Sequence, residues 1–245
     1  RTALEQNTEL AEAAYNLAQA YLRNGDTQAY QRQMENFQKL KEQNDQINHL
    51  RDAFQRNPNG SERAAILTNI GQIYLKRGRY EEAVWEYQKA IGMNPEQVEA
   101  YNGIGMAYAM LGKYDAAISA QRKALLLRPD MAEAHAGLGL IYFLQGKEDL
   151  SMKHYRQAIS VKPTLLEPYL KIGLILLNQK RYAEAAQAYQ SALNIAPQEA
   201  QAYHNLGLCY ALQGKIEEAL NAYRQAIQLR PDSAETHYLM GEVYA

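Results

Sequence analysis

Residues 98–131, VEAYNGIGMAYAMLGKYDAAISAQRKALLLRPDM, form one copy of a unit that recurs along most of the chain. The glycine of this unit returns every 34 residues, at Gly71, Gly105, Gly139, Gly173, Gly207 and Gly241. Prolines and alanines keep the same step, at Pro95, Pro129, Pro163, Pro197 and Pro231 and at Ala90, Ala124, Ala158, Ala192 and Ala226. A fixed period of this length is typical of stacked arrays with two helices per unit. The sequence therefore predicts an all-α fold, an α-solenoid with a pair of helices in each unit.

The regular part of the chain spans residues 61–245. We expect five full units, 64–97, 98–131, 132–165, 166–199 and 200–233, and a partial sixth, 234–245. In each unit a first helix (helix A) precedes a turn, and a second helix (helix B) ends before the proline. Glycines occupy four of the turns, at Gly78, Gly112, Gly146 and Gly214, whereas the fourth unit has Lys180. Because a glycine inside a helix costs about 1 kcal/mol relative to alanine, the recurring glycine of helix A indicates close packing against helix B.

The first 60 residues follow the pattern less closely. Residues 10–24 have the apolar spacing of an amphipathic helix, and Gly25 suits the left-handed residue that ends it. The proline that ends helix B in the regular units has no counterpart here. We therefore predict one long helix over about residues 27–56, the extended second helix of a degenerate first repeat. The polar stretch EQNDQ at 42–46 leaves two shorter helices as an alternative. The sequence NPNGS at 57–61 predicts the loop that follows.

The repeated residues resemble the tetratricopeptide repeat family. Counted from the start of a unit, they are a small residue at position 8, Tyr at 11, Ala at 20, an aromatic residue at 24, Ala at 27 and Pro at 32. The match covers residues 64–245 almost without a gap and 11–40 weakly, whereas 41–63 depart from it. The resemblance implies a right-handed superhelix of antiparallel helix pairs, in which the A helices line a concave groove that receives peptides or partner helices.

Composition excludes several classes of function. The 245 residues carry a formal net charge of -1, which is the wrong balance for a surface that binds nucleic acid. The chain has no run of 18 apolar residues, so we expect a soluble protein without membrane insertion. The single cysteine, Cys209, cannot form an internal disulfide, so the compartment stays open between cytoplasm and periplasm or secretion.

The sequence shows no catalytic or metal-binding pattern. The five histidines never stand at the i, i+4 spacing of a helical zinc pair, and Cys209 has no second thiol. The basic residues that follow the turns, such as Arg79 and Lys113, are explained by the favourable placement of cations at helix C-termini. We therefore expect neither enzymatic activity nor a cofactor or metal.

One departure from the family concerns the face of helix A that points into the groove. Helical spacing places positions 5, 9 and 13 on this face, where polar residues are usual. Here the middle units are apolar, and we predict a peptide-binding groove formed by Met106, Met110, Leu140, Phe143, Leu144, Leu170, Leu174, Leu177, Leu208 and Leu212. We place Gln72, Asn102, Asn178 and His204 on its polar rim. The alternative is that neighbouring A helices, or another part of the chain, cover much of this apolar face.

Three hypotheses for function follow. The first is a scaffold that binds an apolar or amphipathic peptide or helix, and it predicts that Leu140→Glu with Leu174→Glu abolishes partner capture and leaves the melting temperature nearly unchanged. The second is a regulatory or substrate-docking arm of a larger enzyme or membrane-associated assembly. The third is a homo-oligomer formed through the uncapped C-terminal face, since repeat arrays normally end in a polar cap and the last repeat stops within its helix A.

Overall fold

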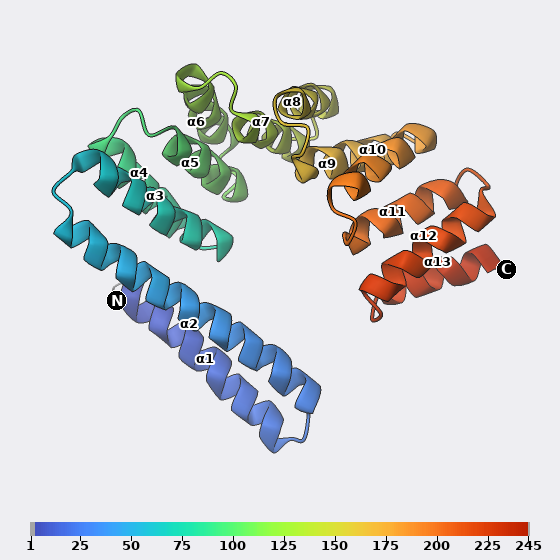
Figure 1. Cartoon of the computed structure of the whole chain (residues 1–245), viewed down its shortest axis with the longest axis horizontal. Coiled ribbons are helices and arrows are strands. Elements are labelled where there is room, and N and C mark those ends of the chain that lie inside the picture. The colour runs from blue at the N-terminus through green and yellow to red at the C-terminus, as the bar shows by residue number, and fades with distance from the viewer. Residues whose placement is uncertain (1–2, 245) are drawn as a thin grey trace. The chain divides into compact units, whose positions relative to one another are not determined.

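The computed structural model describes residues 3–244, and all regular structure within them is helical (Figure 1). The helices are α1 (Ala3–Arg23), α2 (Thr27–Arg56), α3 (Gly60–Lys76), α4 (Tyr80–Met93), α5 (Val98–Met110), α6 (Tyr114–Leu127), α7 (Ala132–Leu144), α8 (Glu148–Val161), α9 (Leu166–Asn178), α10 (Tyr182–Ile195), α11 (Ala200–Ala211), α12 (Ile216–Leu229) and α13 (Ala234–Tyr244). The predicted all-α solenoid of helix pairs is confirmed.

The chain divides into two compact units, residues 1–123 and 124–245, and the boundary falls within α6. In the first unit, each of the helices α1 to α4 packs against the next, α4 packs against α5, and α3 also contacts α5. In the second unit, each helix from α7 to α12 packs against its successor, and each of the A helices α7, α9 and α11 also contacts the next A helix. Each unit therefore contains its own stack of helices, held by contacts between near neighbours.

Glycine and tyrosine form the repeated packing element. A Cβ placed on Gly173 of α9 would lie 2.8 Å from the ring of Tyr189 on α10, which is fully buried. Gly139 and Tyr155 meet in the same way between α7 and α8. The absence of a side chain at this position of helix A is therefore what admits the ring of helix B, as the recurring glycine predicted.

Gln121 of α6 interrupts this pattern. It occupies the position of the buried tyrosine in the other units and is itself fully buried beside Gly105. Its side-chain Nε2 donates to the carbonyl oxygen of Asn102 at 3.1 Å, whereas its Oε1 has no hydrogen-bond partner. Helix α6 therefore packs against α5 through a polar side chain, whereas the B helices of the other regular units pack through a tyrosine ring.

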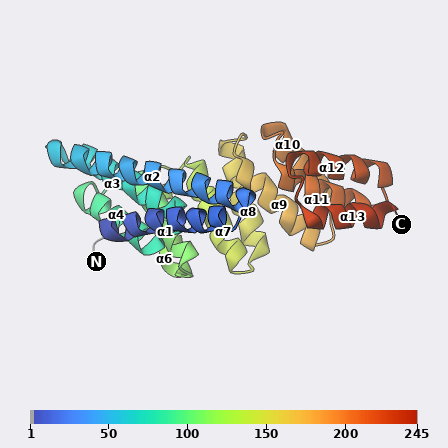
Figure 2. The ribbon, with the colours of Figure 1, turned by 90° about the horizontal axis from the view of Figure 1, so that it is seen from below.

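The long second helix is continuous from Thr27 to Arg56, so the predicted single helix is confirmed and the break in EQNDQ is not observed. Asp26 caps its first turn by accepting from the backbone N–H of Ala29 at 2.9 Å. Figure 2 shows α1 and α2 side by side, as Figure 1 does. The later part of α2 packs against α3 instead, with Ile47 buried in the core of the first unit.

Candidate binding sites

Three consecutive A helices of the second unit carry the apolar residues of the predicted groove. Leu144 at the end of α7 is 41% exposed, and Leu212 directly after α11 is 49% exposed. Five other predicted groove residues on these helices are half-buried: Phe143, Leu170, Leu174, Leu177 and Leu208. We call the exposed and half-buried residues Phe143, Leu144, Leu174, Leu177, Leu208 and Leu212 the apolar row. The Lys171 ammonium lies 5.4 Å from the centre of the Phe143 ring, so α9 contributes a cation at the edge of this row.

Two predicted groove residues lie inside the protein. Leu140 is only 7% exposed and His204 only 6%, and the His204 ring contacts Thr236 of the neighbouring helix α13. The placement of His204 on an open rim is therefore wrong, and Leu140 offers little surface to a partner. The other rim residues Gln72 and Asn178 are exposed, and Asn102 is half-buried.

His204 belongs to a hydrogen-bonded cluster between α11 and α13. Its Nδ1 lies 2.8 Å from the hydroxyl of Thr236, which in turn lies 2.7 Å from the hydroxyl of Ser233. The carboxylate of Glu235 lies 3.8 Å from Nε2. Burial lowers the pKa of His204, and the opposing effect of Glu235 is smaller. The cluster thus joins the last helix to its neighbour through a neutral imidazole.

Met106 and Met110 lie on α5, in the first unit. Met106 is half-buried and Met110 is exposed at the end of the helix. Thioether side chains adapt to irregular apolar partners, so these two methionines give the first unit a small apolar surface of its own.

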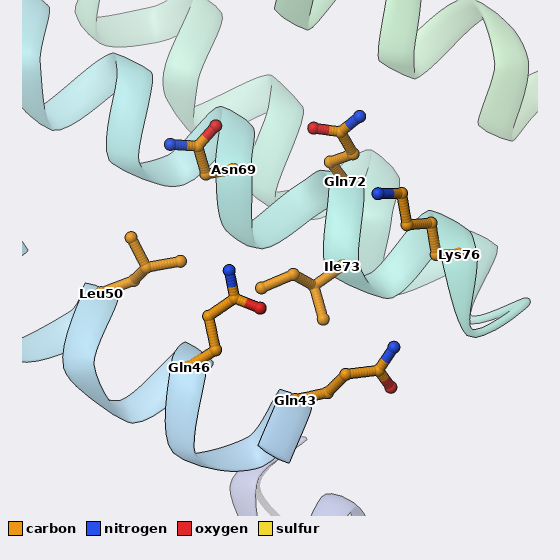
Figure 3. Close-up of a pocket in the computed structure, with 7 residues that line it drawn as sticks. All are labelled: Gln43, Gln46, Leu50, Asn69, Gln72, Ile73 and Lys76. Carbon is orange, nitrogen blue, oxygen red and sulfur yellow. The ribbon is translucent and has the colours of Figure 1, made fainter. Parts of the chain in front are cut away.

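A cavity of ≈ 330 Å³ lies between α2 and α3 and was not predicted from the sequence. We call it the carboxamide cavity, and it is lined by Gln43, Gln46, Leu50, Asn69, Gln72, Ile73 and Lys76. Figure 3 shows Gln46 and Leu50 facing α3 from α2, with Ile73 opposite them, while Asn69, Gln72 and Lys76 project from α3. Four of its seven lining residues are carboxamides, and none is acidic.

The sequence contained a signal for this cavity. Gln43, Gln46 and Leu50 are spaced i, i+3, i+7, and so are Asn69, Gln72 and Lys76, which places each set on one face of its helix. What the sequence does not show is that these two faces meet. That depends on how the extended part of α2 docks on α3.

Arg77 closes one end of the interface between the two helices. Its guanidinium donates to Gln43 Oε1 and Asn44 Oδ1 at 2.8 Å and to the carbonyl oxygen of Leu40 at 3.0 Å. All three acceptors are neutral, and no carboxylate among residues 3–244 forms an ion pair with Arg77. Burial is the main cause of a lowered Arg77 pKa. A half-buried positive charge therefore stands beside the cavity without a countercharge.

The histidines of α7, α8, α11 and α13 and the cysteine of α11 lie in packed or hydrogen-bonded surroundings. Within the described part of the chain, no three His, Cys, Asp or Glu residues converge as metal ligands would. Cys209 is buried, and burial raises the pKa of its thiol to about 11, so the nucleophilic thiolate is scarce at neutral pH. The rings of His135 and Tyr142 each stack near His154, at 5.9 and 5.5 Å between centroids. No helix between residues 3 and 244 combines the length and apolar character that a bilayer crossing requires.

Comparison with family models covers most of the chain. A model described as TPR repeat matches residues 71–112, 173–214 and 209–245. Three further models, each described as tetratricopeptide repeat, match residues 96–164, 47–91 and 11–29. The last of these falls on α1, where the sequence pattern is weak. No curated protein matches the chain.

Solved structures with the same fold include the MamA protein, which is 26% identical with a TM-score of 0.56, over 70% of this chain and 94% of that one. YrrB, described as a TPR protein with an unusual peptide-binding site, is 23% identical with a TM-score of 0.55, over 78% of this chain and 96% of that one. A chain of the APC/C hetero-tetramer Cut9-Hcn1 is 23% identical with a TM-score of 0.68, over 83% of this chain and 40% of that one. At 23% identity the last two likenesses concern the fold alone.

Proposed function

Because the chain belongs to the tetratricopeptide repeat family, we propose that it is a non-enzymatic scaffold that binds a protein segment on the apolar row of its second unit. The observation that carries the proposal is the exposure of Leu144 and Leu212 at equivalent positions of α7 and α11, with half-buried leucines of α9 between them. Large apolar side chains are costly to leave in water, so the apolar row favours an apolar partner.

The dimensions of the row suit an amphipathic helix. Packed helices lie roughly 8 to 10 Å apart, so equivalent residues of α7, α9 and α11 repeat at about that distance. Residues i and i+7 of a helix are separated by roughly 10.5 Å along its axis. A partner helix that crosses the three A helices would therefore meet successive A helices with residues two turns apart on its apolar face. An extended apolar peptide is the alternative form of this ligand.

The remaining groove predictions belong to this proposal as lesser contacts. Leu170 is half-buried on α9 and contributes area, while Leu140 contributes through its small exposed edge. Asn178 supplies a polar group at the rim. In the first unit, we propose that Met106 and Met110 form an apolar contact of the same kind, with Asn102 and Gln72 as polar neighbours. If the chain is a docking arm of a larger assembly, it would bind its ligand through the same surfaces. That hypothesis differs from the scaffold hypothesis only in the larger assembly of which the chain would be a part.

The test replaces the two most exposed leucines of the row. Leu144→Glu with Leu212→Glu introduces two charges that an apolar ligand cannot solvate, and we expect binding of a model amphipathic helix to weaken at least about tenfold, or roughly 1.4 kcal/mol. Fluorescence anisotropy measures this with a labelled peptide that carries leucines at i, i+3 and i+7. A scrambled peptide of the same composition tests whether the amphipathic face is recognised.

The matched control is Leu150→Glu with Leu229→Glu. These leucines are 41% and 40% exposed, but they lie on α8 and α12, which are B helices outside the row. Both double variants place glutamate at positions that are already exposed to solvent. Their melting temperatures should therefore stay close to that of the unmodified chain. Equal loss of binding in both variants, or none in the first, would contradict the proposal. Leu140→Glu is unsuitable, since it would bury a charge in the core.

A further inference from the structure

The carboxamide cavity has the chemistry of a second site, distinct from the apolar row in both location and character. It lies in the first unit, between α2 and α3, and it presents amide groups and a lysine around two aliphatic residues. We propose that it binds an extended protein segment that places an acidic side chain at Lys76. This inference does not depend on the proposed function of the second unit.

The amide groups of Gln46, Asn69 and Gln72 are exposed, so a ligand can replace the water to which they are hydrogen-bonded. The side chains of Gln46, Asn69 and Gln72 make no hydrogen bond to any other described residue. Each carboxamide offers both a donor and an acceptor. A peptide backbone presents the same two groups at every residue, so an extended segment can pair with several carboxamides at once. A regular helix cannot, because its own backbone groups are already bonded to one another.

The charge at one end of the cavity indicates an acidic ligand. The Lys76 side chain is exposed and has no carboxylate partner among residues 3–244. Arg77, which follows it, is bonded only to neutral oxygens of α2. Two adjacent cations without countercharges attract an anion, and a carboxylate there would gain charge-assisted hydrogen bonds. No acidic residue lines the cavity to oppose it.

The spacing of the cavity residues matches an extended chain. Asn69 and Lys76 are seven residues apart on α3, roughly 10.5 Å along the helix axis. About three residues of an extended strand cover this length at roughly 3.3 Å per residue. Side chains two apart on such a segment point the same way. An acidic residue at Lys76 would therefore bring an aliphatic residue, two positions away, onto Leu50 and Ile73.

The cavity exists because α2 is longer than any other B helix of the chain. Those from α4 to α12 have 14 residues, whereas α2 has 30 and its later part forms the wall opposite α3. Arg77 holds this wall in place through its three bonds to α2. The proposed specificity is thus a property of this chain's extended helix and is absent from its regular helix pairs.

The test uses immobilised pools of heptapeptides in which the central residue is Glu, Gln or Lys and the other positions are random. We expect the intact chain to be retained at least about fivefold better by the Glu pool than by the Gln pool, and least by the Lys pool, as charge complementarity requires. Lys76→Gln should remove the preference for Glu. Gln72→Leu should reduce retention on the Glu and Gln pools alike, because it removes a backbone contact.

The control is Lys113→Gln, which makes the same change of charge at an exposed turn of the first unit outside the cavity. It should leave the Glu preference unchanged, as should Leu144→Glu with Leu212→Glu, which separates this site from the apolar row. A Glu preference that is absent, that survives Lys76→Gln, or that disappears equally in Lys113→Gln would overturn the proposal. Lys76-dependent retention by immobilised poly(U), without preference among the peptide pools, would also overturn it in favour of a phosphate backbone.

Discussion

At the scale of single residues, Gly173 shows how a recurring glycine becomes a structural requirement. The ring of Tyr189 occupies the space that a side chain at this position would need, since a Cβ with ideal geometry would lie 2.8 Å from the ring. The ring is fully buried, so the side chains packed around it oppose its displacement. Gly92, by contrast, has nothing within 4 Å of the position that its Cβ would take, although it too lies in a helix.

We predict opposite effects for two identical substitutions. Gly173→Ala should lower the free energy of unfolding by about 1 to 3 kcal/mol, because overpacking outweighs the better helix propensity of alanine. Gly92→Ala should raise it by about 0.5 to 1 kcal/mol, because only the propensity gain remains. Urea unfolding followed by circular dichroism measures both. A stabilised Gly173→Ala variant would show that the ring can relax.

At the scale of helices and turns, Lys180 is the exception to the rule that a left-handed glycine joins helix A to helix B. The turns between helix A and helix B elsewhere use glycine with φ between 70° and 76°, at Gly25, Gly78, Gly112, Gly146 and Gly214. Lys180 adopts φ of 60° in the same position after α9. The left-handed conformation costs a residue with a Cβ roughly 1 to 2 kcal/mol, and the packing of α9 and α10 must offset this.

Lys180→Gly should therefore stabilise the protein by about 1 kcal/mol. The measurement is the midpoint of thermal unfolding, which should rise. The reverse change, Gly214→Lys, should lower the midpoint by a similar amount at an equivalent turn. An unchanged midpoint for Lys180→Gly would mean that the turn residue carries no strain.

At the scale of the whole molecule, stability depends on contacts between successive helices within each compact unit. In such arrays a local defect weakens its neighbours first. Hydrogen exchange of the Gly173→Ala variant should therefore show lost protection in α9 and α10 and smaller losses in the adjacent pairs. Protection in α1 to α4, which belong to the other unit, should be unchanged. A uniform loss along the chain would instead indicate one cooperative structure.

Much of the fold could be predicted because the residues that recur in each unit are those that pack the two helices of a pair together. Spacing and composition predicted the close packing of the helix A glycine, the structural role of the helix B tyrosine and the length of α2. The burial of Gln121 in place of the tyrosine was not predicted. The repeat pattern is defined by the residues that recur, and it does not indicate whether a residue that differs from the pattern is buried. The candidate sites were predicted less well, because exposure at positions 5 and 9 of helix A depends on the neighbouring helix.

The sequence by itself determined the helix pairs, their order and the apolar character of the second unit's A helices, because a residue's place on its own helix follows from helical periodicity. Only the tertiary structure decided that Leu140 and His204 are buried while Leu144 and Leu212 are exposed, since adjacent A helices cover some positions and leave others open. It alone brought the carboxamides of α2 and α3 around one cavity. The reason is the same in both cases: which faces meet is set by packing between helices, and this is not encoded in the periodicity of either helix.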